Sequence, residues 1–283
     1  MSAPSLLVTT AWLADHLGDP DLRLLDSTVE NVDGRYVADR AGFEAGHIPG
    51  AQFVDLQGDI SDQNSRLSFT APQPADFARA MERFGVGEGT RVVVYSRGNF
   101  WWATRVWWLL RLFGFDAAAV LDGGWKAWVA EGRPIETGAG RRPPPGRFAV
   151  HAARPVIAGK ERVLAAVGDG STCTINALPA ASHSGAAPSS YGRSGHIKGS
   201  VNVPGVALID PASGRFRPRA EIEQMFRDAG ALDKDTVISY CGGGITATAT
   251  AFALALIGRP DPLVYDGSLQ EWAADERLPM VTG

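Results

Sequence analysis

The chain has little cysteine: Cys173 and Cys241 are the only two in 283 residues. Two cysteines cannot form the disulfide framework of a small secreted domain, and a reducing compartment would keep both as free thiols. The first twenty residues also lack the basic start, long apolar run and small-residue cleavage site of a secretory signal. We therefore expect a cytoplasmic protein.

The sequence also lacks a strong excess of either charge. Lysine and arginine number 27 against 31 aspartate and glutamate residues, which gives a formal net charge of −4. Because proteins that bind nucleic acid or anionic membranes carry a basic surface, we expect neither partner. No close pair of cysteines or histidines has the spacing of zinc ligands, and we expect no metal and no other cofactor.

The apolar stretch at residues 237–257 has no charge and is long enough to cross a membrane. It contains three successive glycines, which disfavour a single spanning helix. The same residues are consistent with a buried strand, a glycine turn and a buried helix. With 45% hydrophobic and 20% charged residues, the chain is predicted to be globular, with this stretch in a core.

The sequence repeats itself once, in three blocks that keep their order. The paired blocks are GHIPG 46–50 with GHIKG 195–199, the apolar runs 91–96 and 236–241, and DGG 122–124 with DGS 266–268. Similar offsets between the pairs indicate a duplicated domain rather than an array of repeats. The second pair sets Ser96 opposite Cys241.

A stretch rich in glycine and proline separates the two copies. Its three successive prolines cannot lie in a helix or a central strand. We predict an N-terminal domain over residues 1–138, a linker over 139–150 and a C-terminal domain over 151–283.

Each half alternates short apolar strands with helices. We expect strands at 22–27, 90–96, 172–177 and 235–241, amphipathic helices at 74–85 and 219–230, and apolar helices after 90–96 and 235–241. This alternation predicts an α/β fold with mainly parallel sheets flanked by helices. In such sheets ligands bind beyond the carboxyl ends of the strands, which is where Cys241 ends its strand.

Cys241 has surroundings that could make it reactive. Three glycines follow it, so the backbone amides can turn toward the sulfur, and the next helix directs its positive end to the same point. Both effects favour the thiolate, which is the nucleophilic form. On this motif alone, a buried cysteine in a tight turn remains the alternative.

The motif YCGGGITA at 240–247, together with the paired GHI and DG blocks, resembles the two-domain rhodanese family of thiosulfate and 3-mercaptopyruvate sulfurtransferases. The resemblance covers almost the whole chain. It implies two tandem rhodanese-like domains, of which only the second carries a catalytic cysteine, here Cys241. Ser96 cannot hold a transferable sulfur, so the first domain is expected to be inactive.

The resemblance further implies a sulfur transfer in two steps. The Cys241 thiolate takes the outer sulfur of a small anionic donor, becomes a persulfide, and passes the sulfur to cyanide or to a thiol, including that of a thioredoxin-like protein. The loop amides would stabilise the persulfide as an oxyanion hole stabilises charge. These are the amides of Gly242, Gly243, Gly244, Ile245 and Thr246.

The donor is left open between thiosulfate and 3-mercaptopyruvate. The neutral loop CGGGIT resembles the mercaptopyruvate type, but the serine that this type carries after Cys-Gly is Gly243 here. Thr246 or Thr248 are the nearest hydroxyls that could replace it.

The arginines that grip the donor in the family are absent from the stretch 176–185. We therefore expect Arg193 to bind the donor anion, because a guanidinium can give two hydrogen bonds to a carboxylate or a sulfonate. His183, in place of a family phenylalanine, is a further candidate for the site. His47 and His196 occur in both copies, so a role in the fold is expected for them, and Cys173, inside a strand, is expected to be inert.

The sequence bears on two other functions. A phosphatase of the Cys-x5-Arg type needs an arginine six residues after the cysteine, where this chain has Ala247. A noncatalytic or protein-to-protein sulfur relay, with little activity toward small donors, is the alternative that the missing arginines favour.

Overall fold

The computed structural model describes residues 5–150 and 154–283, which form two compact units. The first unit comprises the chain up to Asn64, Ala71–Arg154 and Pro211–Phe216. The second comprises Ser65–Thr70, Pro155–Asp210 and Arg217–Gly283. One short segment of each half therefore belongs to the unit of the other half, which the sequence repeat did not predict.

The first unit is built on a five-stranded parallel sheet. Its order is β1 (Leu7–Val8), β7 (Ala118–Leu121), β6 (Arg91–Tyr95), β2 (Leu22–Asp26) and β5 (Ala51–Phe53). Four residues of the central strand β6 are buried, as the valine-rich run predicts for a strand covered on both faces. A separate hairpin is formed by β3 (Val29–Val32) and β4 (Arg35–Ala38).

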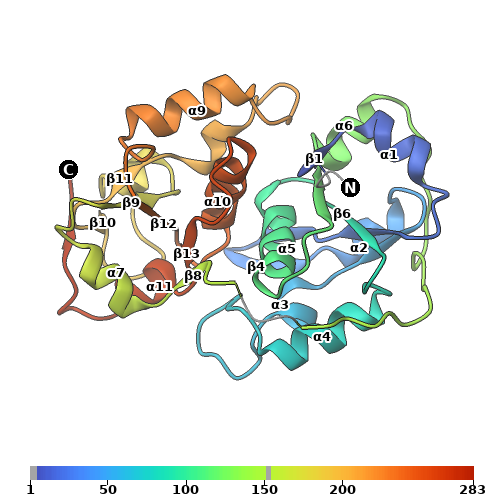
Figure 1. Cartoon of the computed structure of the whole chain (residues 1–283), viewed down its shortest axis with the longest axis horizontal. Coiled ribbons are helices and arrows are strands. Elements are labelled where there is room, and N and C mark those ends of the chain that lie inside the picture. The colour runs from blue at the N-terminus through green and yellow to red at the C-terminus, as the bar shows by residue number, and fades with distance from the viewer. Residues whose placement is uncertain (1–4, 151–153) are drawn as a thin grey trace. The chain divides into compact units, whose positions relative to one another are not determined.

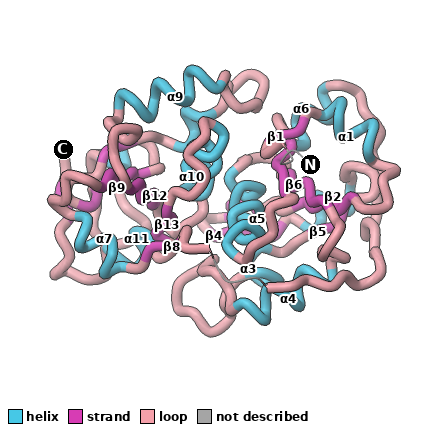
Figure 2. Tube along the Cα trace, in the orientation of Figure 1, coloured by secondary structure: helices cyan, strands magenta, loops and turns pink. Residues whose placement is uncertain are grey.

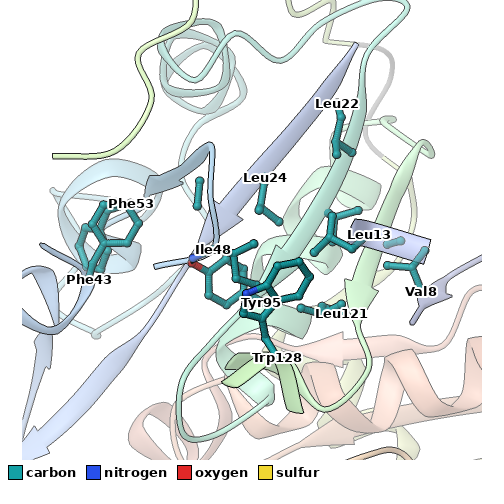
Figure 3. Close-up of a cluster of buried hydrophobic side chains, with 13 residues drawn as sticks. Val8, Leu13, Leu22, Leu24, Phe43, Ile48, Phe53, Tyr95, Leu121 and Trp128 are labelled. Atoms are coloured by element: carbon teal, nitrogen blue, oxygen red, sulfur yellow. The ribbon is translucent and has the colours of Figure 1, made fainter. Parts of the chain in front are cut away.

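Six helices accompany this sheet: α1 (Thr10–His16), α2 (Arg40–Ala45), α3 (Leu56–Ile60), α4 (Pro74–Arg83), α5 (Trp101–Leu112) and α6 (Gly124–Ala130). The amphipathic helix α4 buries Phe77, Ala80 and Met81, whereas α5 is buried almost all round. Figure 3 shows one core cluster of this unit, in which Tyr95 and Leu24 of the sheet lie near Trp128 of α6. Apolar burial of such large side chains is the main force that holds the layers together.

The second unit repeats this plan. Its parallel sheet has the order β11 (Val201–Asn202), β9 (Thr172–Asn176), β12 (Thr236–Tyr240), β13 (Leu263–Tyr265) and β8 (Ile157–Ala158). The accompanying helices are α7 (Lys160–Ala166), α8 (Ala180–His183), the 3-10 helix η1 (Gly205–Leu208), α9 (Arg219–Asp228), α10 (Thr246–Leu256) and α11 (Ser268–Trp272). A short antiparallel pair joins β10 (His196–Ile197) to β14 (Met280–Val281). In Figures 1 and 2, β9, β12 and β13 run beside one another, and α10 passes next to them.

Equivalent contacts in the two units confirm the duplication. The hydroxyl of Tyr95 accepts the N–H of Ile48 at 3.3 Å, and that of Tyr240 accepts the N–H of Ile197 at 3.0 Å. These bonds tie the end of each central strand to the turn that carries the GHI block. The strands and helices expected from the sequence, and the α/β class, are confirmed.

The two histidines of the GHI blocks also make matching contacts. Nδ1 of His47 lies 2.9 Å from the carbonyl oxygen of Phe43, and Nδ1 of His196 lies 2.8 Å from that of His183. The ring of His47 also stacks on that of Phe43, and the ring of His196 stacks on that of His183. Both histidines therefore hold their turns, in agreement with the predicted role in the fold.

Residues 139–150, predicted to be a linker, pack along the first unit. The N–H of Arg141 donates to the carbonyl of Ala51 at 2.9 Å, and the N–H of Gly146 donates to that of Glu82 at 2.8 Å. Phe148 is buried beside Phe77 and Phe115. Proline has no backbone N–H to donate, but the residues on either side of the prolines hydrogen-bond to the first unit. The stretch is therefore packed on that unit.

The uncharged stretch 237–257 forms β12 and α10, as predicted. The helix has 11 residues and is buried almost throughout. Among the described residues, none of the helices has the length and apolar character needed to span a membrane.

Candidate active site

Cys241 follows the last residue of β12, the central strand of the second unit. Tyr240 pairs with Asn176 at the end of β9, so Cys241 lies at the carboxyl edge of the sheet, where parallel sheets bind ligands. Its thiol is free and the residue is 2% exposed. The helix α10 begins five residues later, at Thr246.

Ser268, which the sequence did not single out, organises the loop after Cys241. Its Oγ accepts the N–H groups of Cys241 and Gly244, both at 3.1 Å, and donates to the carbonyl of Tyr265 at 2.7 Å. The side chain is fully buried, so these bonds have no competition from water. Ser268 thus fixes the first and fourth residues of the loop to the end of β13.

The backbone of Ser268 is left-handed, with φ +47°. Few residues other than glycine adopt such a φ. The matching residue of the first copy, Gly124, has φ +52°, and the bond from the Trp125 N–H to the Ser96 carbonyl matches the one from Leu269 to Cys241, both at 3.1 Å. The DGG and DGS pairing was therefore a usable signal for this turn, although it could not show what the serine hydroxyl binds.

The loop amides differ in what they bind. The amide of Gly244 is directed to Ser268, which corrects the expectation that it turns toward the sulfur. No hydrogen bond is found for the N–H groups of Gly242, Gly243, Ile245 and Thr246 within residues 5–150 and 154–283. These four N–H groups are therefore the ones with which the loop could hydrogen-bond a bound anion.

Gly244 must be glycine for two reasons. Its φ is +76°, and a Cβ at this position would lie 2.5 Å from the carbonyl oxygen of Asp266. The turn therefore excludes a side chain at this point.

Gln270 is the second residue that the sequence did not identify. Its backbone N–H donates to the carbonyl of Gly242 at 2.9 Å. Its side-chain amide accepts the N–H of Ser68 at 3.2 Å and donates to the Ser68 carbonyl at 2.9 Å. The same amide lies 3.3 Å from where a Cβ of Gly243 would be. Gln270 therefore joins the segment Ser65–Thr70 to the loop after Cys241 within the second unit.

Arg193 makes contacts that differ from the predicted ones. Its guanidinium donates to four backbone carbonyls at 2.7 to 3.2 Å, those of Trp272, Ala273, Asp275 and Leu278. Four of the five N–H donors of an arginine are then occupied. The side chain ties its own segment to the end of α11, and these contacts argue against the role of donor-binding cation.

His183 likewise belongs to the fold. Its ring stacks on His196 with centroids 3.8 Å apart, in the place that Phe43 takes beside His47. Burial, with a smaller effect of His196, lowers the pKa of His183 to about 4. The imidazole is therefore neutral near pH 7 and serves as a flat apolar ring, which explains why it can stand where a phenylalanine would.

The remaining candidates also take structural places. Thr248 is fully buried and its hydroxyl donates to the carbonyl of Ile245 at 2.7 Å, while the methyl group of Thr246 faces Gly205. Burial raises the pKa of the Cys173 thiol, so this cysteine carries little thiolate, as expected for an inert residue. In the first unit, the hydroxyl of Ser96 donates to the carbonyl of Asn99 at 2.8 Å.

Comparison with known proteins agrees with this geometry. The model of the rhodanese-like domain matches residues 9–131 and 186–275. The chain is 34% identical to the 3-mercaptopyruvate sulfurtransferase of Escherichia coli strain K12, with 95% of each chain covered. It is also 34% identical to the thiosulfate sulfurtransferase of Gallus gallus, with 94% of this chain and 92% of that protein covered.

A solved structure shows the same fold. The crystal structure of the 3-mercaptopyruvate sulfotransferase SseA from Escherichia coli superposes with a TM-score of 0.83 at 33% identity, covering 94% of this chain and 99% of that one. The family match, the two full-length relatives and this superposition agree with one another. The chain belongs to the rhodanese family and is a sulfurtransferase.

Proposed function

We propose that Cys241 carries a sulfur atom as a persulfide, taken from thiosulfate or 3-mercaptopyruvate and passed to cyanide or to a thiol. In the first step the thiolate attacks the outer sulfur of the donor, a new S–S bond forms, and the bond between that sulfur and the rest of the donor breaks. In the second step the acceptor attacks the same sulfur and Cys241 leaves as thiolate. Covalent catalysis of this kind divides one transfer into two easier ones.

The observation that carries this proposal is the position of Cys241 at the end of the central strand. It is followed by four amides that have no acceptor among the described residues, and then by the start of α10. Backbone N–H groups and the positive end of a helix favour an anion there. A thiolate and a persulfide are both anions, so one arrangement serves both states of the cycle.

Mass spectrometry after exposure to each donor tests the proposal. We expect the wild-type chain to gain the mass of one sulfur atom on Cys241 and to lose it on addition of cyanide, with formation of thiocyanate. Cys241→Ser should gain nothing and form no thiocyanate. Cys173→Ala is the matched control, because it removes the other thiol from a strand and should leave the adduct in place. An adduct on Cys173, or none on either cysteine, would contradict the proposal.

Sulfur relay between proteins is a second candidate, and the engagement of Arg193 favours it. With that guanidinium bound to four carbonyls, a small anionic donor has no help from this cation. A relay would take sulfur from a protein persulfide at least about ten times faster than from either small donor at equal concentration, a ratio that corresponds to 1.4 kcal/mol. Single-turnover rates with a persulfide-bearing thioredoxin-like protein and with both small donors decide between the two functions.

A further inference from the structure

Tyr191 lies directly against the loop after Cys241. A Cβ built on Gly242 would meet the Tyr191 ring at 2.0 Å from Cζ and 2.2 Å from Oη. The hydroxyl end of the ring therefore occupies the space beside the Gly242 backbone, one residue from the thiol. Only glycine at position 242 leaves room for it.

The segment that carries Tyr191 is firmly held. The N–H of Tyr191 donates to the hydroxyl of Ser189 at 3.0 Å, and its ring packs on the core cluster that contains Tyr240 and Trp272. Arg193, two residues later, binds four carbonyls at the end of α11. Arg193 thus fixes the position of Tyr191 rather than that of the donor.

Two other hydroxyls near the loop bond to backbone carbonyls, and the methyl group of Thr246 faces Gly205. The hydroxyls of Ser268 and Thr248 donate to the carbonyls of Tyr265 and Ile245. Gly243 occupies the position at which the mercaptopyruvate type, which this loop resembles, carries a serine. A phenol beside Gly242 is in a position to supply the hydroxyl that Gly243 lacks.

We propose that Tyr191 is the acid–base residue for the transfer from 3-mercaptopyruvate, an inference that rests on the persulfide chemistry proposed for Cys241. When Cys241 attacks the thiol sulfur of this donor, the C–S bond breaks and its electron pair passes to carbon, which gives the enolate of pyruvate. Tyr191 donates its phenolic proton to that carbon and regains a proton from the newly formed hydropersulfide. Over the step, thiolate and mercaptopyruvate become the persulfide anion and pyruvate, so atoms and charge balance.

Thiosulfate needs no such proton. There the S–S bond of the donor breaks, and sulfite leaves with the electron pair as a stable anion. Transfer from 3-mercaptopyruvate therefore needs a proton from Tyr191, whereas transfer from thiosulfate does not. A chemical role of Tyr191 would affect only the first reaction, and a structural role would affect both.

The test compares Tyr191→Phe with the wild-type chain on both donors. General acid–base catalysis contributes about 10²- to 10⁴-fold, so we expect kcat/KM for 3-mercaptopyruvate to fall by about 100-fold or more, while that for thiosulfate changes by less than about 3-fold. Tyr36→Phe, on the exposed hairpin of the first unit, is the control and should match the wild type on both donors.

A second variant tests whether the missing serine is what Tyr191 replaces. Gly243→Ser introduces a hydroxyl whose Cβ meets only the flexible amide of Gln270, at 3.3 Å. In the Tyr191→Phe background it should restore about 10-fold of the lost activity with 3-mercaptopyruvate and leave thiosulfate activity unchanged. The rescue would show that a hydroxyl at this place acts on the reaction.

Equal losses with both donors, or no loss with either, would overturn the inference, and so would a wild-type chain that uses thiosulfate but ignores 3-mercaptopyruvate. None of these results touches the persulfide itself. Absence of the sulfur adduct in the wild-type chain with both donors would instead overturn the proposed function.

Discussion

At the scale of single residues, Ser268 shows how much of the site depends on a contact that no local pattern reveals. The cysteine, the glycines and the helix that follows form one continuous motif, so their positions could be predicted from the sequence. Ser268 and Gln270 reach the loop from the end of another strand, and their partners are backbone groups that any sequence would offer. The contacts of Arg193 could not be predicted for the same reason, since the sequence does not reveal which backbone carbonyls an arginine binds.

Removing the Ser268 hydroxyl should loosen the loop and slow the reaction. Ser268→Ala removes the hydroxyl that accepts the N–H groups of Cys241 and Gly244, and the loss of the acceptor for the buried Cys241 N–H costs about 1–3 kcal/mol. We expect a drop of about 1–3 kcal/mol in the free energy of unfolding, measured by denaturant titration, and at least a 10-fold fall in kcat/KM with thiosulfate.

Ser268→Gly is the matched control, because it loses the same bonds but accepts the left-handed backbone at φ +47° without strain. It should equal Ser268→Ala in activity. Wild-type activity in either variant would show that the loop does not need this hydroxyl.

His183 should make the protein sensitive to acid. Its pKa is about 4 in the folded chain against an ordinary value of 6.5, so the unfolded state binds the proton more strongly. The stability that this residue contributes is complete above pH 6.5 and is lost as the pH falls from there to about 4.

His183→Phe, which copies Phe43 of the first unit, removes this dependence. Melting temperatures at pH 7 and pH 5 measure it: we expect the wild type to lose about 1 kcal/mol more than the variant between these values, after allowance for partial exposure of the ring to solvent. That corresponds to about 2–4 °C in Tm for a chain of this size. Parallel pH profiles of the two proteins would refute the assignment.

At the scale of elements, apolar runs predicted the strands β6 and β12, and amphipathic runs predicted α4 and α9. These elements were predictable because burial on one face gives a helix an apolar period, whereas burial on both faces gives a strand a continuous apolar run. The segment Ser65–Thr70 was not predictable, because it has no regular structure and its backbone bonds to a glutamine from the other half of the chain.

Gln270→Ala should free this segment while the fold persists. Its side-chain amide makes both bonds to Ser68, so the Ser68 N–H loses its acceptor. We expect faster hydrogen exchange in the peptide that covers residues 65–70, by about 5- to 10-fold, which corresponds to the loss of about 1 kcal/mol of local stability. Gln224→Ala, on the exposed face of α9, is the control and should leave that peptide unchanged. Identical exchange in both variants would mean that other contacts hold the segment.

At the scale of the whole molecule, each unit is completed by residues from the other half of the sequence. In the first unit, Arg215 pairs with Asp122 and Glu131, and the N–H of Phe216 donates to Asp122 at 2.9 Å. The duplication was visible in the sequence, because the two copies still share similar residues in the three repeated blocks. The exchange of segments was not, because Ser65–Thr70 and Pro211–Phe216 precede the equivalent helices α4 and α9, and the sequence does not show which unit each segment joins.

Separated halves should therefore be less stable than the intact chain. A fragment of residues 155–283 lacks the partner of Gln270, and a fragment of residues 1–154 lacks Arg215 and Phe216. We expect the melting temperature of each fragment to fall at least about 5 °C below that of the intact chain, measured by circular dichroism. Co-expression of the two fragments supplies both missing segments and should recover part of the loss. A 155–283 fragment that melts with the intact protein and forms the persulfide equally fast would contradict this expectation.

The bond between Gln270 and Ser68 also bears on why a copy without a thiol persists. Deleting the first copy would remove six residues from the unit that holds Cys241, so we expect that neither copy can be removed without repair of the other. A minimal enzyme designed from residues 155–283 should begin by giving Gln270 a new backbone partner, for instance through a short added loop, before any change is made to the chemistry.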